Sequence, residues 1–143
     1  MFRLIVAATD FSPSADEAWR VTVELAKIHR AELLLLHVTM ASARAPGVWQ
    51  LDEGRQEQRG LAEHELQRRV AMASARTLTA KTLIETGDPP CVIAEVATRQ
   101  AADLIVVGAH GRHAKGPLIG SVGERLLRLA PCAVLTVPRG GDR

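Results

Sequence analysis

This chain lacks most of the features that would place it in a specialised class. It has no tyrosine, aromatic residues make up 3% of its 143 residues, and it has only two cysteines, Cys91 and Cys132. Two such distant cysteines are too few for a disulfide framework or a zinc site. No apolar run approaches the ~20 residues of a membrane span, and no leader pattern precedes one. The 18 basic and 16 acidic residues are interleaved, which excludes a nucleic-acid stripe. We therefore expect a soluble, cytoplasmic protein with no membrane or nucleic-acid partner.

Five short apolar runs are present, and they alternate with helical patterns. The runs are Leu4–Ala8, Leu33–Val38, Thr79–Glu85, Leu104–Val107 and Ala133–Val137. Continuous apolar runs are typical of strands buried on both faces, hence of a parallel sheet covered by helices. The sequence thus predicts one α/β domain over residues 1–143, a doubly wound five-stranded parallel sheet with helices on both faces and strand order 3-2-1-4-5. The third run is the most polar and suits a sheet edge.

Helix signals occupy the segments between these runs. Pro13 and a Ser14/Glu17 capping box predict the start of the first helix, and a Ser121/Glu124 box predicts the start of the last. The expected inward stripes are Ala18, Val21, Leu25 and Ile28; Ala62, Leu66, Val70 and Ala73; Ile93, Val96 and Ala97; and Val122, Leu126 and Leu129. From Thr39 to Arg55 the pattern is interrupted, and we expect a mobile loop of functional length there.

A glycine-rich segment follows the fourth predicted strand. It begins at Gly108, carries Gly111, Gly116 and Gly120, and leads into the last helix. Phosphate can bind at such a place, because backbone N–H groups are accessible where no Cβ intervenes and a first helical turn has unpaired donors. Neither a Walker A motif nor a dinucleotide fingerprint is present. Spacing alone leaves phosphate binding and a plain surface loop equally open.

Charged side chains lie at the same predicted edge of the sheet. Asp10 ends the first strand, where it can accept a hydrogen bond from a ribose hydroxyl, help hold a divalent ion, or form a local turn. Arg112 and Lys115 can pair with phosphate oxygens or remain solvated. His110 and His113 are two ligands at most, so we interpret them as solvent- or phosphate-facing imidazoles and not as a metal site.

Several motifs, in their order along the chain, resemble the universal stress protein (UspA) family. They are LIVAATDFS from Leu4, LLHV ending at Val38, the Gly87-Asp88-Pro89 turn, VVGAHG from Val106, GSVGERLL from Gly120 and APCAVLTVP from Ala130. The resemblance covers essentially the whole chain. It implies an adenine nucleotide alpha hydrolase-like (Rossmann-like) fold, a role in the stress response, and a homodimer formed by antiparallel pairing of the fifth strands, Ala133–Val137.

One branch of that family binds ATP through the pattern G-x2-G-x9-G-(S/T). By resemblance, the ATP-binding residues would be Ala8, Thr9, Asp10, Val38, Val107, Gly108, His110, Gly111, Arg112, Gly120, Ser121 and Val122. Here eight residues, 112–119, separate Gly111 from Gly120, and Pro117 stiffens that segment.

Three hypotheses follow from this departure from the family pattern. The first is a homodimeric stress-response regulator that binds ATP, with or without Mg²⁺, and acts on an unidentified protein partner. The second is a nucleotide-independent dimeric interaction module. The third is a slow ATPase or self-phosphorylating protein, for which the chain offers only loose candidates. We assign no catalytic residue and no metal ligand.

Overall fold

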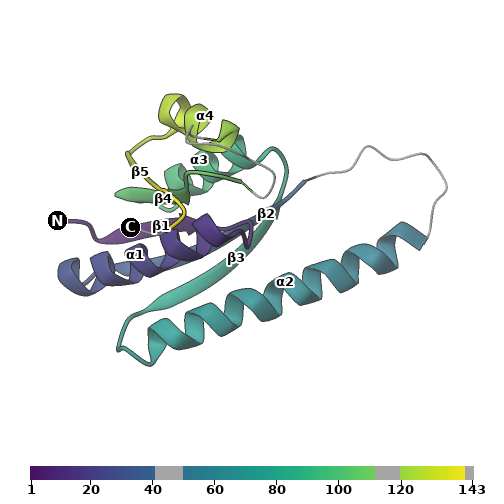
Figure 1. Ribbon diagram of the computed structural model, residues 1–143, viewed down its shortest axis with the longest axis horizontal. Helices are drawn as coiled ribbons and strands as arrows, with labels where there is room; N and C mark the ends of the chain where they lie inside the picture. Colours follow the sequence, from purple (N-terminus) through teal and green to yellow (C-terminus); the bar gives the residue numbers. More distant parts are fainter. Residues whose placement is uncertain (41–49, 112–119, 141–143) are drawn as a thin grey trace.

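The computed structural model describes residues 1–40, 50–111 and 120–140, with only the backbone described for residues 50–53 (Figure 1). Its elements are β1 (Leu4–Ala8), α1 (Pro13–His29), β2 (Glu32–Thr39), α2 (Gln50–Ser74), β3 (Ala80–Thr86), α3 (Pro89–Arg99), β4 (Leu104–Gly108), α4 (Ser121–Leu129) and β5 (Ala133–Val137). The strands form one parallel sheet in the order β3-β2-β1-β4-β5, so the predicted fold is confirmed.

The alternation of side chains along the strands divides the core into two layers. Ile5, Leu33, Leu35 and Val106 belong to the layer that packs against α1 and α2. The opposite layer, packed against α3 and α4, contains Val6, Leu34, Leu36, Ile105 and Val107. Both faces of the central strands are therefore removed from water, which is why these strands read as continuous apolar runs.

The first helix differs from its predicted pattern in two ways. Ser12, not Ser14, is the N-cap, and its side chain accepts a hydrogen bond from the Ala15 backbone N–H at 3.2 Å. The buried face also differs from the predicted stripe, since Ile28 is 74% exposed while the face that includes Trp19 and Thr22 is buried. Thr22 tolerates this burial because its Oγ1 donates to the Ala18 carbonyl at 2.7 Å.

The second helix is longer than predicted. It begins at Gln50, so the loop expected from Thr39 to Arg55 was wrong over its last residues, and positions 41–49 lie outside the described residues. Glu, Gln and Arg dominate its first turns and are good helix formers, which outweighs the cost of Gly54 and Gly60. Figure 1 shows these turns extending beyond the sheet. The predicted inward residues, Ala62, Leu66, Val70 and Ala73, are all buried.

The last two helices pack on the other face of the sheet. Ile93, Val96 and Ala97 of α3 are buried as predicted. In α4, Leu126 is fully buried, but Leu129 is 46% exposed because the helix ends there and the chain turns extended at Ala130. Among the described residues, no helix is both long and apolar enough to cross a membrane.

Candidate functional site

The carboxyl ends of β1 and β4 meet where the order of the strands reverses. Ala7 of β1 lies beside Val106 of β4 in the sheet register. Beyond these positions, residues 9–12 and 108–111 leave the sheet side by side. A Cβ built on Gly111 would lie 3.6 Å from Oδ2 of Asp10. The structure thus brings Asp10 to the start of the glycine-rich segment, in the crevice where ligands of doubly wound sheets bind.

Asp10 lies in a tight turn between β1 and α1. Its Oδ1 accepts a hydrogen bond from the Ser12 N–H at 2.9 Å, and Thr9 Oγ1 accepts one from the Phe11 N–H at 3.0 Å. Phe11 has a φ of 62°, in the left-handed region that few non-glycine residues adopt. Asp10 therefore forms the local turn with one oxygen and directs the other, Oδ2, toward Gly111.

His37 holds this turn from β2. Its Nδ1 lies 2.7 Å from the Thr9 carbonyl oxygen, and because a carbonyl can only accept, Nδ1 carries the proton of this hydrogen bond. The His37 ring also contacts the Phe11 ring, with centroids 4.6 Å apart. The Thr9 N–H donates to the Leu36 carbonyl at 2.8 Å, so both backbone polar groups of Thr9 are bound by β2. The strand of His37 thereby positions the residue next to Asp10.

Ser14 fixes the glycine-rich segment from α1. Its Oγ donates to the His110 carbonyl at 2.7 Å and accepts from the His110 N–H at 3.2 Å. A Cβ on Gly108 would lie 2.2 Å from this Oγ and 2.8 Å from the Ala15 backbone nitrogen. Sequence spacing suggested only a cap for Ser14, because the partner that determines its role lies 96 residues away.

The N-terminus of α4 lies against the same segment. Gly120 donates its N–H to the Ala109 carbonyl at 2.6 Å, and Ala109 in turn donates to Val137 of β5 at 2.7 Å. The expected Ser121 cap is wrong: Gly120 is the N-cap and supplies no side-chain hydrogen bond. The first-turn N–H groups, those of Ser121 and Val122 included, consequently have no side-chain cap among the described residues and can serve an external acceptor.

The remaining predicted site residues fall into two groups. Ala8 and Val38 are half-buried and Val107 is buried, and all three pack in the layer below the crevice. Arg112, His113 and Lys115 lie outside the described residues. His110 is described, and its Nδ1 is buried without a hydrogen-bond partner among the described residues.

Comparison with known proteins identifies the family. Residues 1–138 match the profile described as the Universal stress protein family. The chain is 32% identical over 139 residues to Universal stress protein Sll1654 of Synechocystis, covering 96% of this chain and 87% of that protein. The structure of UspA from Lactobacillus plantarum superposes with a TM-score of 0.82 at 27% identity, covering 94% and 97% of the two chains.

A further solved structure carries a ligand. It is a universal stress protein family protein from Arabidopsis thaliana with AMP bound, with a TM-score of 0.74 and 26% identity, covering 98% of this chain and 94% of that one. In each comparison the match extends over nearly the whole chain. The strand order of the sheet, β3-β2-β1-β4-β5, is also the order expected from the family resemblance. The chain therefore belongs to the universal stress protein family.

Proposed function

We propose that this protein binds an adenine nucleotide, with ATP as the ligand, at the crevice between β1 and β4, and acts as a homodimeric regulator in a stress response. The observation that carries the proposal is the convergence of three groups. The Asp10 Oδ2 atom lies beside Gly111, and the N-terminus of α4, which has no side-chain cap, lies next to Gly111 as well. A carboxylate suits ribose hydroxyls, and a helix N-terminus suits phosphate.

Each part of the nucleotide would have its own contacts. The adenosine would lie against Ala8, Thr9 and Val38, with Asp10 accepting from the ribose. The phosphates would lie along the backbone of the glycine-rich segment and the first turn of α4. The residues assigned to ribose and phosphates are Val107, Gly108, His110, Gly111, Arg112, Gly120, Ser121 and Val122. Mg²⁺ would be bound mainly by the phosphates, as is usual for this ion.

The AMP-bound relative from Arabidopsis thaliana supports the class of ligand. The number of phosphates that contact the protein has still to be tested. The segment between Gly111 and Gly120 has eight residues here, one fewer than in the ATP-binding pattern of the family. ATP and AMP should therefore be titrated side by side. Clearly tighter binding of ATP would indicate that the protein contacts the β- and γ-phosphates. Equal affinities would restrict the contacts to the nucleoside and the α-phosphate.

The test is calorimetric titration of MgATP into the wild type and an Asp10→Asn variant. Asparagine keeps the oxygen that accepts from the Ser12 N–H, so the turn survives, but it replaces Oδ2 by an amide that cannot accept. A hydrogen bond to a charged group contributes about 1.5–3 kcal/mol, so we expect affinity to fall roughly 10- to 100-fold. Glu57→Gln, on the exposed part of α2, is the matched control and should bind as the wild type does.

The negative outcomes separate the alternatives. Absence of heat and of any thermal shift in the wild type would refute nucleotide binding and leave a nucleotide-independent interaction module. Wild-type affinity in Asp10→Asn would refute the role of the carboxylate. Phosphate release during the titration would favour a slow ATPase.

The proposed dimer would form along β5. This strand is at the edge of the sheet and pairs with β4 on one side. Val134, Leu135 and Thr136 remain partly exposed, so a second copy of the strand could extend the sheet. Sedimentation equilibrium should give twice the chain mass. A monomer at micromolar concentration would refute this part of the proposal.

A further inference from the structure

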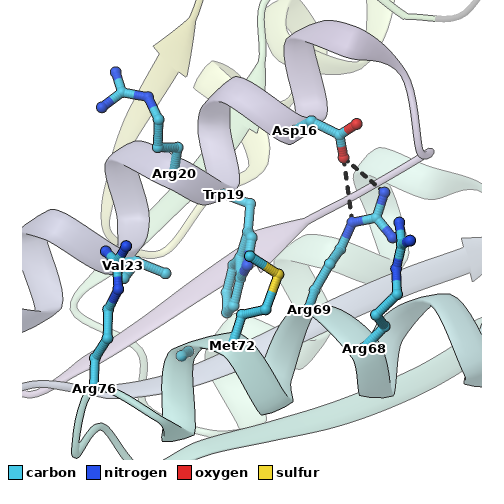
Figure 2. A pocket seen from close by; sticks show the side chains of 9 residues that line it. Asp16, Trp19, Arg20, Val23, Arg68, Arg69, Met72 and Arg76 are labelled. Atoms are coloured by element: carbon cyan, nitrogen blue, oxygen red, sulfur yellow. Dashed lines mark hydrogen bonds and ion pairs between the residues drawn. The ribbon is translucent and has the colours of Figure 1, made fainter.

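A concave site lies between α1 and α2. It is a groove of about 330 Å³, which is within the lower range of small-molecule sites. Figure 2 shows its lining, and the residues on which the argument rests are Trp19, Arg20, Arg68, Arg69, Met72 and Arg76. None of the groups proposed to contact the nucleotide lines it.

The groove has an apolar base. Trp19 is 8% exposed and presents a flat indole, while Met72 is 67% exposed and presents a flexible thioether. A flexible thioether beside a buried aromatic ring can adapt to the shape of an apolar ligand. The base therefore favours an apolar body, flat or aliphatic.

The rim of the groove is cationic. Four arginines line it, against one carboxylate, that of Asp16. The side chains of Arg20, Arg68 and Arg76 are 63%, 64% and 53% exposed, and each pairs with a glutamate at the surface. Exposed pairs of this kind contribute only about 0–1 kcal/mol, so a ligand can replace the glutamates at little cost.

Arg69 has a different role from the other three. Its side chain is 11% exposed, and it pairs with Asp16 at 2.8 Å and with Glu65 at 2.7 Å. Its guanidinium also lies 5.1 Å from the centroid of the Phe11 ring. This arginine is fixed between α1 and α2 and holds the two walls of the groove in place.

The residues of α2 that line the groove indicate its length. Arg69 and Arg76 are seven residues apart on one helix, which corresponds to about 10 Å along the groove. We propose that the groove binds an amphipathic organic anion, whose apolar body of about this length lies on Trp19 and Met72 and whose acidic group pairs with Arg20 or Arg76. A guanidinium pairs well with carboxylate and phosphate alike, so the acidic group can be either.

The chain offers a direct reporter for this proposal. It has two tryptophans and no tyrosine, so a Trp49→Phe variant leaves Trp19 as its single indole. In that background, decanoate should shift and saturate the Trp19 emission, with one site per chain by calorimetry. Decyltrimethylammonium, of equal chain length and opposite charge, should give no saturable change. Equal binding of the two probes would overturn the proposal, since it would show apolar adsorption alone.

Paired variants test the role of the rim. Arg20→Gln with Arg76→Gln removes two exposed cations and should weaken decanoate binding at least 5-fold. Arg99→Gln with Arg125→Gln removes two cations of similar exposure, each paired with one carboxylate, from α3 and α4. This control should bind as the background does. An equal loss in both pairs would overturn the proposal by indicating a general effect of net charge, and so would absence of saturable binding by both fluorescence and calorimetry.

Discussion

Replacing Gly108 by alanine tests how the crevice is built. Gly108 ends β4 directly under the first turn of α1, and a Cβ there would lie 2.2 Å from Ser14 Oγ. It would also lie 2.8 Å from two backbone atoms, the Ala15 nitrogen and the Ser14 carbonyl carbon. Real Cβ contacts do not occur at these distances, so α1 or β4 must shift.

The size of the effect follows from which atoms are in the way. A side-chain oxygen can rotate away, but the backbone of a helix that packs on the central strands cannot move alone. Forcing one methyl group into such a place costs about 1–3 kcal/mol, occasionally more. For a chain of this length, each kcal/mol lowers the melting temperature by roughly 2–4 °C. We therefore expect Gly108→Ala to melt roughly 2–12 °C below the wild type.

The assay is thermal and urea unfolding followed by circular dichroism, with three further variants. Gly60→Ala is the matched control, since it lies in a helix and a Cβ added there would meet nothing within 4 Å beyond its own helical backbone. It should stabilise the protein by up to about 1 kcal/mol. Ser14→Ala combined with Gly108→Ala removes the contact with Oγ and also the two hydrogen bonds between Ser14 and His110, so it is compared with Ser14→Ala alone. Most of the loss caused by Gly108→Ala should remain in that comparison. Wild-type stability in Gly108→Ala, or a double variant as stable as Ser14→Ala alone, would show that backbone contact does not decide the cost.

Two further predictions concern stability alone. The Asp103 carboxylate accepts hydrogen bonds from the N–H groups of Arg3 and Leu4 at 2.7 and 3.0 Å, which hold its pKa below the usual value. The carboxylate therefore contributes to the free energy of unfolding above about pH 4, and this contribution is lost as pH falls through the lowered pKa. In urea unfolding, the difference in free energy of unfolding between the wild type and Asp103→Asn should shrink on acidification. Leu66→Ala, at a fully buried position, should cost about 2–5 kcal/mol by the same assay, whereas Leu61→Ala, 69% exposed, should stay within about 0.5 kcal/mol; equal effects would contradict the packing described.

The sheet could be predicted from the sequence because its signal is local. Strands buried on both faces need apolar side chains at successive positions, and this pattern is clearest in the central strands β1, β2 and β4. The order of the strands followed from the alternation of strands and helices together with the assumption that the chain winds one way from β1 and then returns. Asp10 and Gly111 could therefore be expected at one place from the sequence alone.

What could not be predicted depends on distant partners. Ser12 and Ser14 both suit a helix cap, and their roles are decided by the His110 backbone, which takes up the Ser14 hydroxyl. The inward stripe of α1 was predicted in part: Ala18 is buried and Val21 and Leu25 pack against the core, but Ile28 is exposed. The groove could not be predicted from the sequence, because Trp19 and Met72 belong to different helices. The residue pattern of one helix does not indicate which residues of the other helix lie beside it.

The central position of β1 has a consequence for how the chain is made. β1 is synthesised first, and β2 can pair with one of its edges as soon as residues 32–36 are available. Its other edge must wait for Leu104–Val106. At about 5–20 residues per second, this edge stays open for roughly 4–14 seconds of synthesis. An open edge beside Ile5 and Val6 can pair with other chains. During that interval β1 can pair wrongly along this edge, because the first of the five strands to be made is among the last to gain both of its partners.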